Sequence, residues 1–174
     1  MNSNISYPEF KTWKWGSFSE PNRIADIEEF VLLNSSRGME FHIGSDSKMY
    51  GNHTNFVTAL IAHEKSKGGQ IIIHQDKTVK SPSLRQRLIM EAMRTMEVAW
   101  YLDSIIDDNV KIRLHIDVND ELKFKSGQYK EELVGMIMGQ GYSSYESDAI
   151  DNCDKIVFWK PHSWAASTVA DRRT

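Results

Sequence analysis

Acidic side chains occupy two places in this sequence where a buried strand would call for apolar residues. Asp46 lies within the strand-like segment 40–47. Asp117 ends the segment 110–117, in which apolar and polar residues alternate strictly. On adjacent strands the two carboxylates would lie about 4.8 Å apart. Two like charges about 4 Å apart repel by roughly 4 kcal/mol at an effective dielectric near 20. We therefore expect either a raised pKa or a cation bound between the two groups.

A third acid, Glu91, falls at the edge of the apolar stripe of a predicted helix and would point toward the sheet. For this residue alone, a solvated or salt-bridged carboxylate is the alternative interpretation. The candidate ligands are carboxylate oxygens, so they favour Mg²⁺ or Mn²⁺ over zinc. Two such ions bridged by Asp46 would activate a water molecule and stabilise a departing oxyanion. This chemistry is phosphodiester hydrolysis.

Composition limits the remaining possibilities. A chain of 174 residues with 40% hydrophobic content is the size of one compact domain. The single cysteine, Cys153, excludes an internal disulfide and a multi-cysteine zinc site, and it fits a reducing cytoplasm. No apolar run is long enough to span a bilayer, so we expect no membrane association.

The formal net charge of -3 does not provide the long-range attraction to nucleic acid of a strongly basic protein. Any contact with phosphates must come from local basic groups, and ordinary solvated surface is the alternative for them. The candidates are Lys77, Lys80, Arg85, Arg87, Arg94, Lys123, Lys125, Arg172 and Arg173.

Periodicity predicts the elements that would position the acids. An N-terminal arm, residues 1–20, precedes a domain over residues 21–174, which starts with a short helix after Pro21. The later elements are strands at 40–47, 56–63 and 70–80, a helix at 83–106, a strand at 110–117, a helix at 126–138, a strand at 155–160 and a helix at 161–172. Right-handed crossovers place the fourth strand parallel to the first. The expected fold is therefore α/β, with a mixed five-stranded sheet of strand order 3-2-1-4-5 and helices on both faces.

Several short motifs, taken in order, resemble the YkuK family of predicted ribonuclease H-like proteins. They are Ile43-Gly44-Ser45-Asp46-Ser47, His53-Thr54, Phe56, the helix residues Glu91, Thr95, Glu97, Val98 and Ala99, His115-Ile116-Asp117, Lys160-Pro161, Ala166-Ser167 and Ala170-Asp171. The resemblance runs from the first helix to the end of the chain. It implies a ribonuclease H-like fold and a nuclease site in which Asp46, Glu91 and Asp117 are the metal-binding acids.

The resemblance also implies a fourth ligand on the C-terminal helix. Asp171 is the favoured residue, although it comes later in the helix than the last acid of the wider superfamily. His162 occupies the earlier position and is the alternative, as a ligand or a proton carrier. His115 shares a strand face with Asp117, where it would support the site or simply be a satisfied structural residue.

The leading hypothesis is a divalent-metal-dependent nuclease acting on RNA, an RNA/DNA hybrid or structured DNA. A rival hypothesis of a different class, which the neutral-to-acidic charge makes a serious one, is a nucleic-acid-binding module that keeps the fold and the acids but cuts nothing. A nucleotide hydrolase like the actin-related proteins is the third hypothesis, but the chain is too short for the second lobe that it requires. The sequence does not indicate an oligomeric state.

Overall fold

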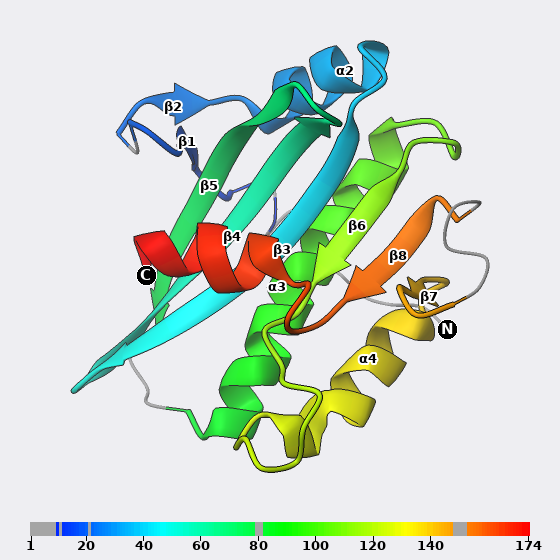
Figure 1. Ribbon diagram of the computed structural model, residues 1–174. Coiled ribbons are helices and arrows are strands. Elements are labelled where there is room, and N and C mark those ends of the chain that lie inside the picture. The colour runs from blue at the N-terminus through cyan, green and yellow to red at the C-terminus, as the bar shows by residue number, and fades with distance from the viewer. Residues whose placement is uncertain (1–9, 11, 21, 79–81, 148–152) are drawn as a thin grey trace.

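A computed structural model describes residues 10, 12–20, 22–78, 82–147 and 153–174 of the chain. The described strands form one mixed sheet in the order β2-β1-β5-β4-β3-β6-β8-β7. Helices lie on both of its faces, as Figure 1 shows. The predicted α/β class is therefore confirmed.

The centre of the sheet has the predicted arrangement. Its strands are β3 (Glu40–Tyr50), β4 (His53–Glu64), β5 (Gly68–Thr78), β6 (Ile112–His115) and β8 (Lys155–Phe158). The first three form an antiparallel meander, and β6 lies parallel to both β3 and β8. The order β5-β4-β3-β6-β8 is the predicted order 3-2-1-4-5.

The predicted number of five strands is wrong, because three short strands extend the sheet among the described residues. At one edge, β1 (Trp15–Ser17) pairs with β5, and β2 (Ile24–Ala25) pairs with β1. At the other edge, β7 (Ser143–Ser144) pairs with β8. Strands of two or three residues are too short to show alternation in the sequence, and they satisfy backbone groups that the sheet edges leave open.

The first helix begins later than predicted. Ile24 belongs to β2, and the helix α2 spans Ile27–Ser36. Its N-cap is Asp26, whose side chain accepts a hydrogen bond from the backbone N–H of Glu29 at 3.0 Å. The cap satisfies a backbone donor that the first turn leaves free, so it sets the start of the helix.

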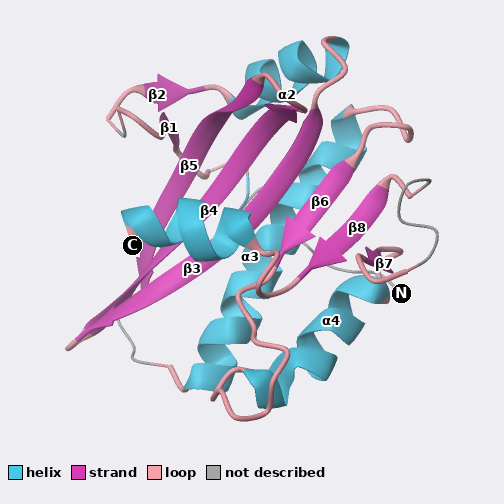
Figure 2. Cartoon of the chain, viewed as in Figure 1, coloured by secondary structure: helices cyan, strands magenta, loops and turns pink. Residues whose placement is uncertain are grey.

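One face of the sheet carries the long helix α3 (Leu84–Ile105), together with α2 and α4 (Lys130–Met138), which follows the short turn η1 (Gly127–Tyr129). Ser83 caps α3 through a capping box with Gln86. Figure 2 shows the C-terminal segment crossing the opposite face. That segment consists of η3 (Ala165–Ala170), with π-type hydrogen bonds, and η4 (Asp171–Arg173).

The sheet therefore separates two hydrophobic cores. The larger core lies between the sheet and α3, and the smaller lies under η3, where Ala165, Val169 and Ala170 meet Val57 and Ile73. No helix in the described ranges is long and apolar enough to cross a membrane.

Candidate active site

Asp46 and Asp117 are brought to adjacent positions by the parallel pairing of β3 and β6. The ladder pairs Gly44 with His115, so the next positions on the same face are Asp46 and Asp117. Asp117 lies two residues beyond the last residue of β6. Asp46 is 8% exposed, and the Asp117 side chain is 19% exposed. The predicted neighbours are therefore neighbours in the fold, in a largely buried setting.

Glu91 reaches this strand end from helix α3. It is buried, and its Oε1 accepts a hydrogen bond from the hydroxyl of Ser47 at 2.5 Å. Ser47 directly follows Asp46 on β3, but its side chain points to the α3 face of the sheet, so the contact fixes the glutamate at this strand end on that face. Glu91 is still near enough for the charge of Asp46 to raise its pKa. Glu91 and Asp117 also line the same narrow crevice between α3 and the sheet.

The C-terminal segment supplies a fourth acid. Asp171 lies close enough to Asp46 for its charge and a side-chain contact to raise the pKa of Asp46. His162 takes another direction, because its ring lies edge-on against Tyr145, with ring centroids 5.0 Å apart. Of the two alternatives, Asp171 is thus the one that the fold brings to Asp46.

The negative charges of these acids repel one another. Burial, followed by the negative charges of Asp117 and Asp171, raises the pKa of Asp46 to about 7. Burial also raises the pKa of Glu91 to about 8, against the Ser47 hydrogen bond, and the charges of Asp46 and Asp117 add to the effect. In both cases the anionic form is the unfavourable one, so a bound cation would be stabilised here.

The protein supplies part of that positive charge itself. The ammonium group of Lys160 lies 2.7 Å from Asp117 Oδ1. Arg87, one helical turn before Glu91, opposes the rise in the pKa of that glutamate. Lys160 compensates the charge of Asp117, and Arg87 partly compensates that of Glu91. Neither cation is among the groups that act on Asp46, so the negative charge at Asp46 is left uncompensated.

The donor set fits a hard divalent cation, and the residues that would hold it are Asp46, Glu91, Asp117 and Asp171. All are oxygen donors, which suit Mg²⁺ and Mn²⁺. Among the described residues, however, no three of these acids bring ligand atoms within 4.8 Å of one another.

We expect the metal-free protein to lose stability as the pH rises. Asp46 and Glu91 have pKa values near 3.8 and 4.5 when unfolded, but about 7 and 8 in the fold. The folded state therefore binds more protons between about pH 4 and pH 8, and the free energy of unfolding falls across that window. Urea titrations in EDTA from pH 5 to pH 8 measure the fall, and Mg²⁺ should reverse it at pH 8. Substituting the exposed Asp108 by asparagine should leave the slope unchanged; the expectation fails if wild-type stability is flat or rises.

Lys160→Gln should bind Mn²⁺ more tightly than the wild type, by up to about tenfold. The ammonium beside Asp117 competes with an added cation, and about 1.4 kcal/mol of removed competition corresponds to tenfold in affinity. Titration calorimetry measures the change. Lys155→Gln is the matched control, because Lys155 pairs with Asp103 at 2.9 Å, outside the acid cluster. Equal or weaker Mn²⁺ binding by Lys160→Gln would show that this lysine does not compete.

Several of the predicted phosphate contacts are engaged within the protein. Arg85 pairs with Glu132, Arg94 pairs with Asp76, and Lys123 pairs with Glu121. The guanidinium of Arg173 lies over the ring of Phe18. Lys80 lies outside the described residues. These internal contacts divide the predicted phosphate-binding surface into smaller groups of basic side chains.

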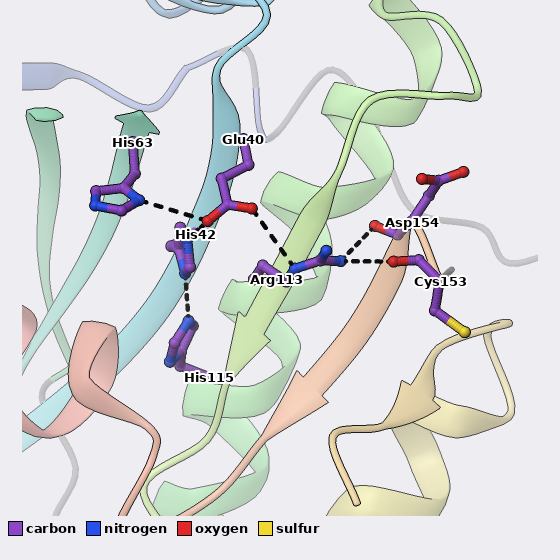
Figure 3. A network of polar contacts seen from close by, with 7 residues as sticks. All are labelled: Glu40, His42, His63, Arg113, His115, Cys153 and Asp154. Atoms are coloured by element: carbon purple, nitrogen blue, oxygen red, sulfur yellow. Dashed lines mark hydrogen bonds and ion pairs between the residues drawn. The ribbon is translucent and has the colours of Figure 1, made fainter. Parts of the chain in front are cut away.

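A second polar group was not singled out by the sequence patterns. His42 shares the face of Asp46, and its Nδ1 lies 2.8 Å from Nε2 of His115. His115 is fully buried, which lowers the pKa of its imidazole well below the usual value. The pair sits next to Glu40 and His63, as Figure 3 shows. Pairing across strands distant in the sequence created this group. The sequence placed His115 on the face of Asp117, but it did not show that His115 meets His42 or that Glu40 and His63 lie beside them.

Comparison with known proteins agrees with the resemblance that the motifs indicated. A family model described as Ribonuclease H-like matches residues 22–174. A curated relative from Bacillus subtilis (strain 168), named Uncharacterized protein YkuK, is 27% identical over 167 residues, covering 85% of this chain and 86% of the relative. No solved structure matches the chain significantly. With the family model covering most of the fold, this chain belongs to the ribonuclease H-like family.

Proposed function

We propose that this protein is a divalent-metal-dependent nuclease that hydrolyses phosphodiester bonds in RNA, RNA/DNA hybrid or structured DNA. One observation carries the proposal. Asp46 is buried beside Asp117 and within hydrogen-bonding reach of Asp171. Burial and the charges of these two neighbours disfavour the anionic form of Asp46. Membership of the ribonuclease H-like family supports a role on nucleic acid.

The roles of the chain's own residues follow from their positions. Asp46, on which the charges of Asp117 and Asp171 both act, would hold the metal together with those two acids. Glu91, whose carboxylate is held by the hydrogen bond from Ser47, would be a further metal-holding acid. When bound, Mg²⁺ or Mn²⁺ supplies activation of the attacking water and stabilisation of the leaving oxyanion. Because burial excludes bulk water, the carboxylates act with less screening than they would at the surface.

The loop that follows Asp117 supports a nucleic-acid substrate. It exposes Leu122 and Phe124, and Lys123 and Lys125 alternate with them. An exposed aromatic ring can stack on an unpaired base, and neighbouring lysines can neutralise phosphates. We therefore place nucleic-acid contact next to the acid cluster, and we place the activity in a reducing cytoplasm on the basis of the single cysteine.

The alternative function is a non-catalytic nucleic-acid-binding module. It is favoured by the ion pair between Lys160 and Asp117, because that lysine holds an acid that the nuclease needs for metal.

The deciding experiment incubates the full chain with labelled RNA, DNA, hybrid and junction substrates in Mg²⁺, Mn²⁺ or EDTA. We expect cleavage of at least one substrate that requires the metal and disappears in Asp46→Asn. Cleavage that persists in that variant would indicate contamination and contradict the proposal. Binding without cutting, equal with and without metal, would establish the binding module instead.

A further inference from the structure

We propose that Glu40, His42 and His63 form a second metal site, of the zinc type, separate from the carboxylate cluster. The three side chains place one possible ligand atom each within 4.8 Å of the other two. They come from the start of β3 and the end of β4, where the ladder pairs Glu40 with His63. Figure 3 shows them converging.

The new site and the carboxylate cluster share a strand face but not a location. His42 precedes Asp46 by four residues on β3, which corresponds to about 13 Å along an extended strand. No ion could contact both. The second site therefore depends on neither the acids nor the proposed nuclease activity.

The measured distances suit a single ion. Glu40 Oε1 lies 2.8 Å from His42 Nε2 and 3.4 Å from His63 Nδ1. Ligands bound tetrahedrally at about 2.0 to 2.2 Å from zinc are about 3.3 to 3.6 Å apart. Small side-chain rotations would therefore bring the three atoms to coordination distance, with no change in the backbone.

The ligand types select the metal. Two imidazoles and one carboxylate form a set that zinc uses at sites with an open fourth position, and imidazole favours zinc and copper over magnesium. Glu40 and His63 remain about one-third exposed, at 29% and 32% for their side chains. Both also line a surface depression of about 640 Å³. A water molecule or a small ligand can therefore reach the fourth position.

Neighbouring groups prepare the ligands. Coordination through His42 Nε2 requires the proton on Nδ1, and Nε2 of His115 is placed 2.8 Å away to accept it. Arg113 lies 3.9 Å from the second oxygen of Glu40 and donates to the backbone carbonyls of Cys153 and Asp154 at 3.1 and 2.9 Å. Arg113 thus holds the Glu40 carboxylate through Oε2, so that Oε1 faces the two histidines. Its positive charge also opposes a dication, so the affinity should be lower than at a zinc site without a neighbouring cation.

Trp164 covers the cluster from the C-terminal segment. Its ring centroid lies 4.7 Å from that of His42, 5.1 Å from that of His115 and 6.3 Å from that of His63. The indole packs against the imidazoles, while Glu40 and His63 also face the surface depression. Metal bound here would hold the imidazoles in the orientation on which the indole packs.

The test measures metal binding by the full chain after removal of metals with a chelator. In excess Mg²⁺, which should occupy the carboxylate cluster, calorimetric titration with Zn²⁺ should give about one equivalent, and Co²⁺ should give the visible absorption of four-coordinate cobalt. His63→Ala and Glu40→Gln should each weaken Zn²⁺ binding by about 100-fold or more, since loss of a direct ligand exceeds the 10- to 100-fold cost of losing a supporting group. Excess Mg²⁺ should not displace the Zn²⁺.

The controls separate this site from others. His53→Ala removes a histidine outside the cluster and should leave Zn²⁺ binding unchanged, as should Asp46→Asn. Unchanged binding in His63→Ala, or binding lost in Asp46→Asn, would overturn the proposal. Because His63 is partly exposed, its substitution keeps the test decisive even if His42→Ala does not fold. The readout is binding, so the result stands whether or not the protein cuts nucleic acid.

Discussion

Asp46→Asn should abolish metal-dependent cleavage while making the metal-free protein more stable. A bound cation contributes several kcal/mol to the transition state, and each 1.36 kcal/mol is tenfold in rate, so we expect a loss of about 1000-fold or more. The neutral amide also removes a buried charge whose pKa the fold raises to about 7. At pH 8, the free energy of unfolding in EDTA should rise by on the order of 2 kcal/mol.

The two effects are measured separately, by single-turnover cleavage in Mn²⁺ and by urea titration in EDTA. Asp108→Asn, at an exposed acid, should change neither quantity. If the variant keeps normal stability and full activity, Asp46 is not part of the active site. A variant that is inactive but also less stable would mean that Asp46 is a structural residue, because a functional acid in this setting is held at a cost to folding.

Gly44→Ala should destabilise the fold by about 3 kcal/mol, at the upper end of the usual cost of overpacking. A Cβ at this position would lie 2.4 Å from the backbone nitrogen of Ala166 and 2.6 Å from the carbonyl carbon of Ala165. Those are main-chain atoms of the C-terminal segment, so the whole segment must move. For a chain of this size, the melting temperature should fall by about 6 to 12 °C. Cleavage should fall as well, because the same segment carries Asp171.

Gly135→Ala is the matched control. A Cβ there meets nothing within 4 Å, and the residue lies exposed in α4. Replacing a glycine inside a helix by alanine should raise stability by about 0.5 to 1 kcal/mol. Opposite signs for the two substitutions, measured by thermal unfolding, would show that close packing of η3 on β3 sets the cost. An unchanged melting temperature in Gly44→Ala would contradict that packing.

The central fold could be predicted because it depends on long, strongly patterned segments. The strands β3, β4 and β5 are joined by short turns and must form a meander. The helix α3 then connects this meander to β6, and such a connection predicts that β6 runs parallel to β3. The crossover predicted that Asp46 and Asp117 lie on adjacent strands, and the observed register, in which Gly44 pairs with His115, puts the two aspartates at equivalent positions beyond that pair. Short edge strands could not be predicted, since two or three residues carry no period.

Other features of the site depend on contacts between distant parts of the chain. Whether Asp171 or His162 approaches Asp46 is decided by the path of the C-terminal segment over Gly44, which is a matter of packing. Periodicity also cannot show that Lys160 pairs with Asp117. The internal ion pairs that engage much of the basic surface are likewise tertiary contacts.

Residue types and their periods thus predicted the sheet order and the neighbouring aspartates, and they indicated oxygen ligands suited to a hard cation. Tertiary packing alone decided how deeply those acids are buried, which cations lie beside them, and that His63 meets Glu40 and His42 across two strands. The physical reason is that hydrophobic alternation specifies which face a side chain occupies. Burial, pKa and ligand distances depend on what the rest of the chain places against that face.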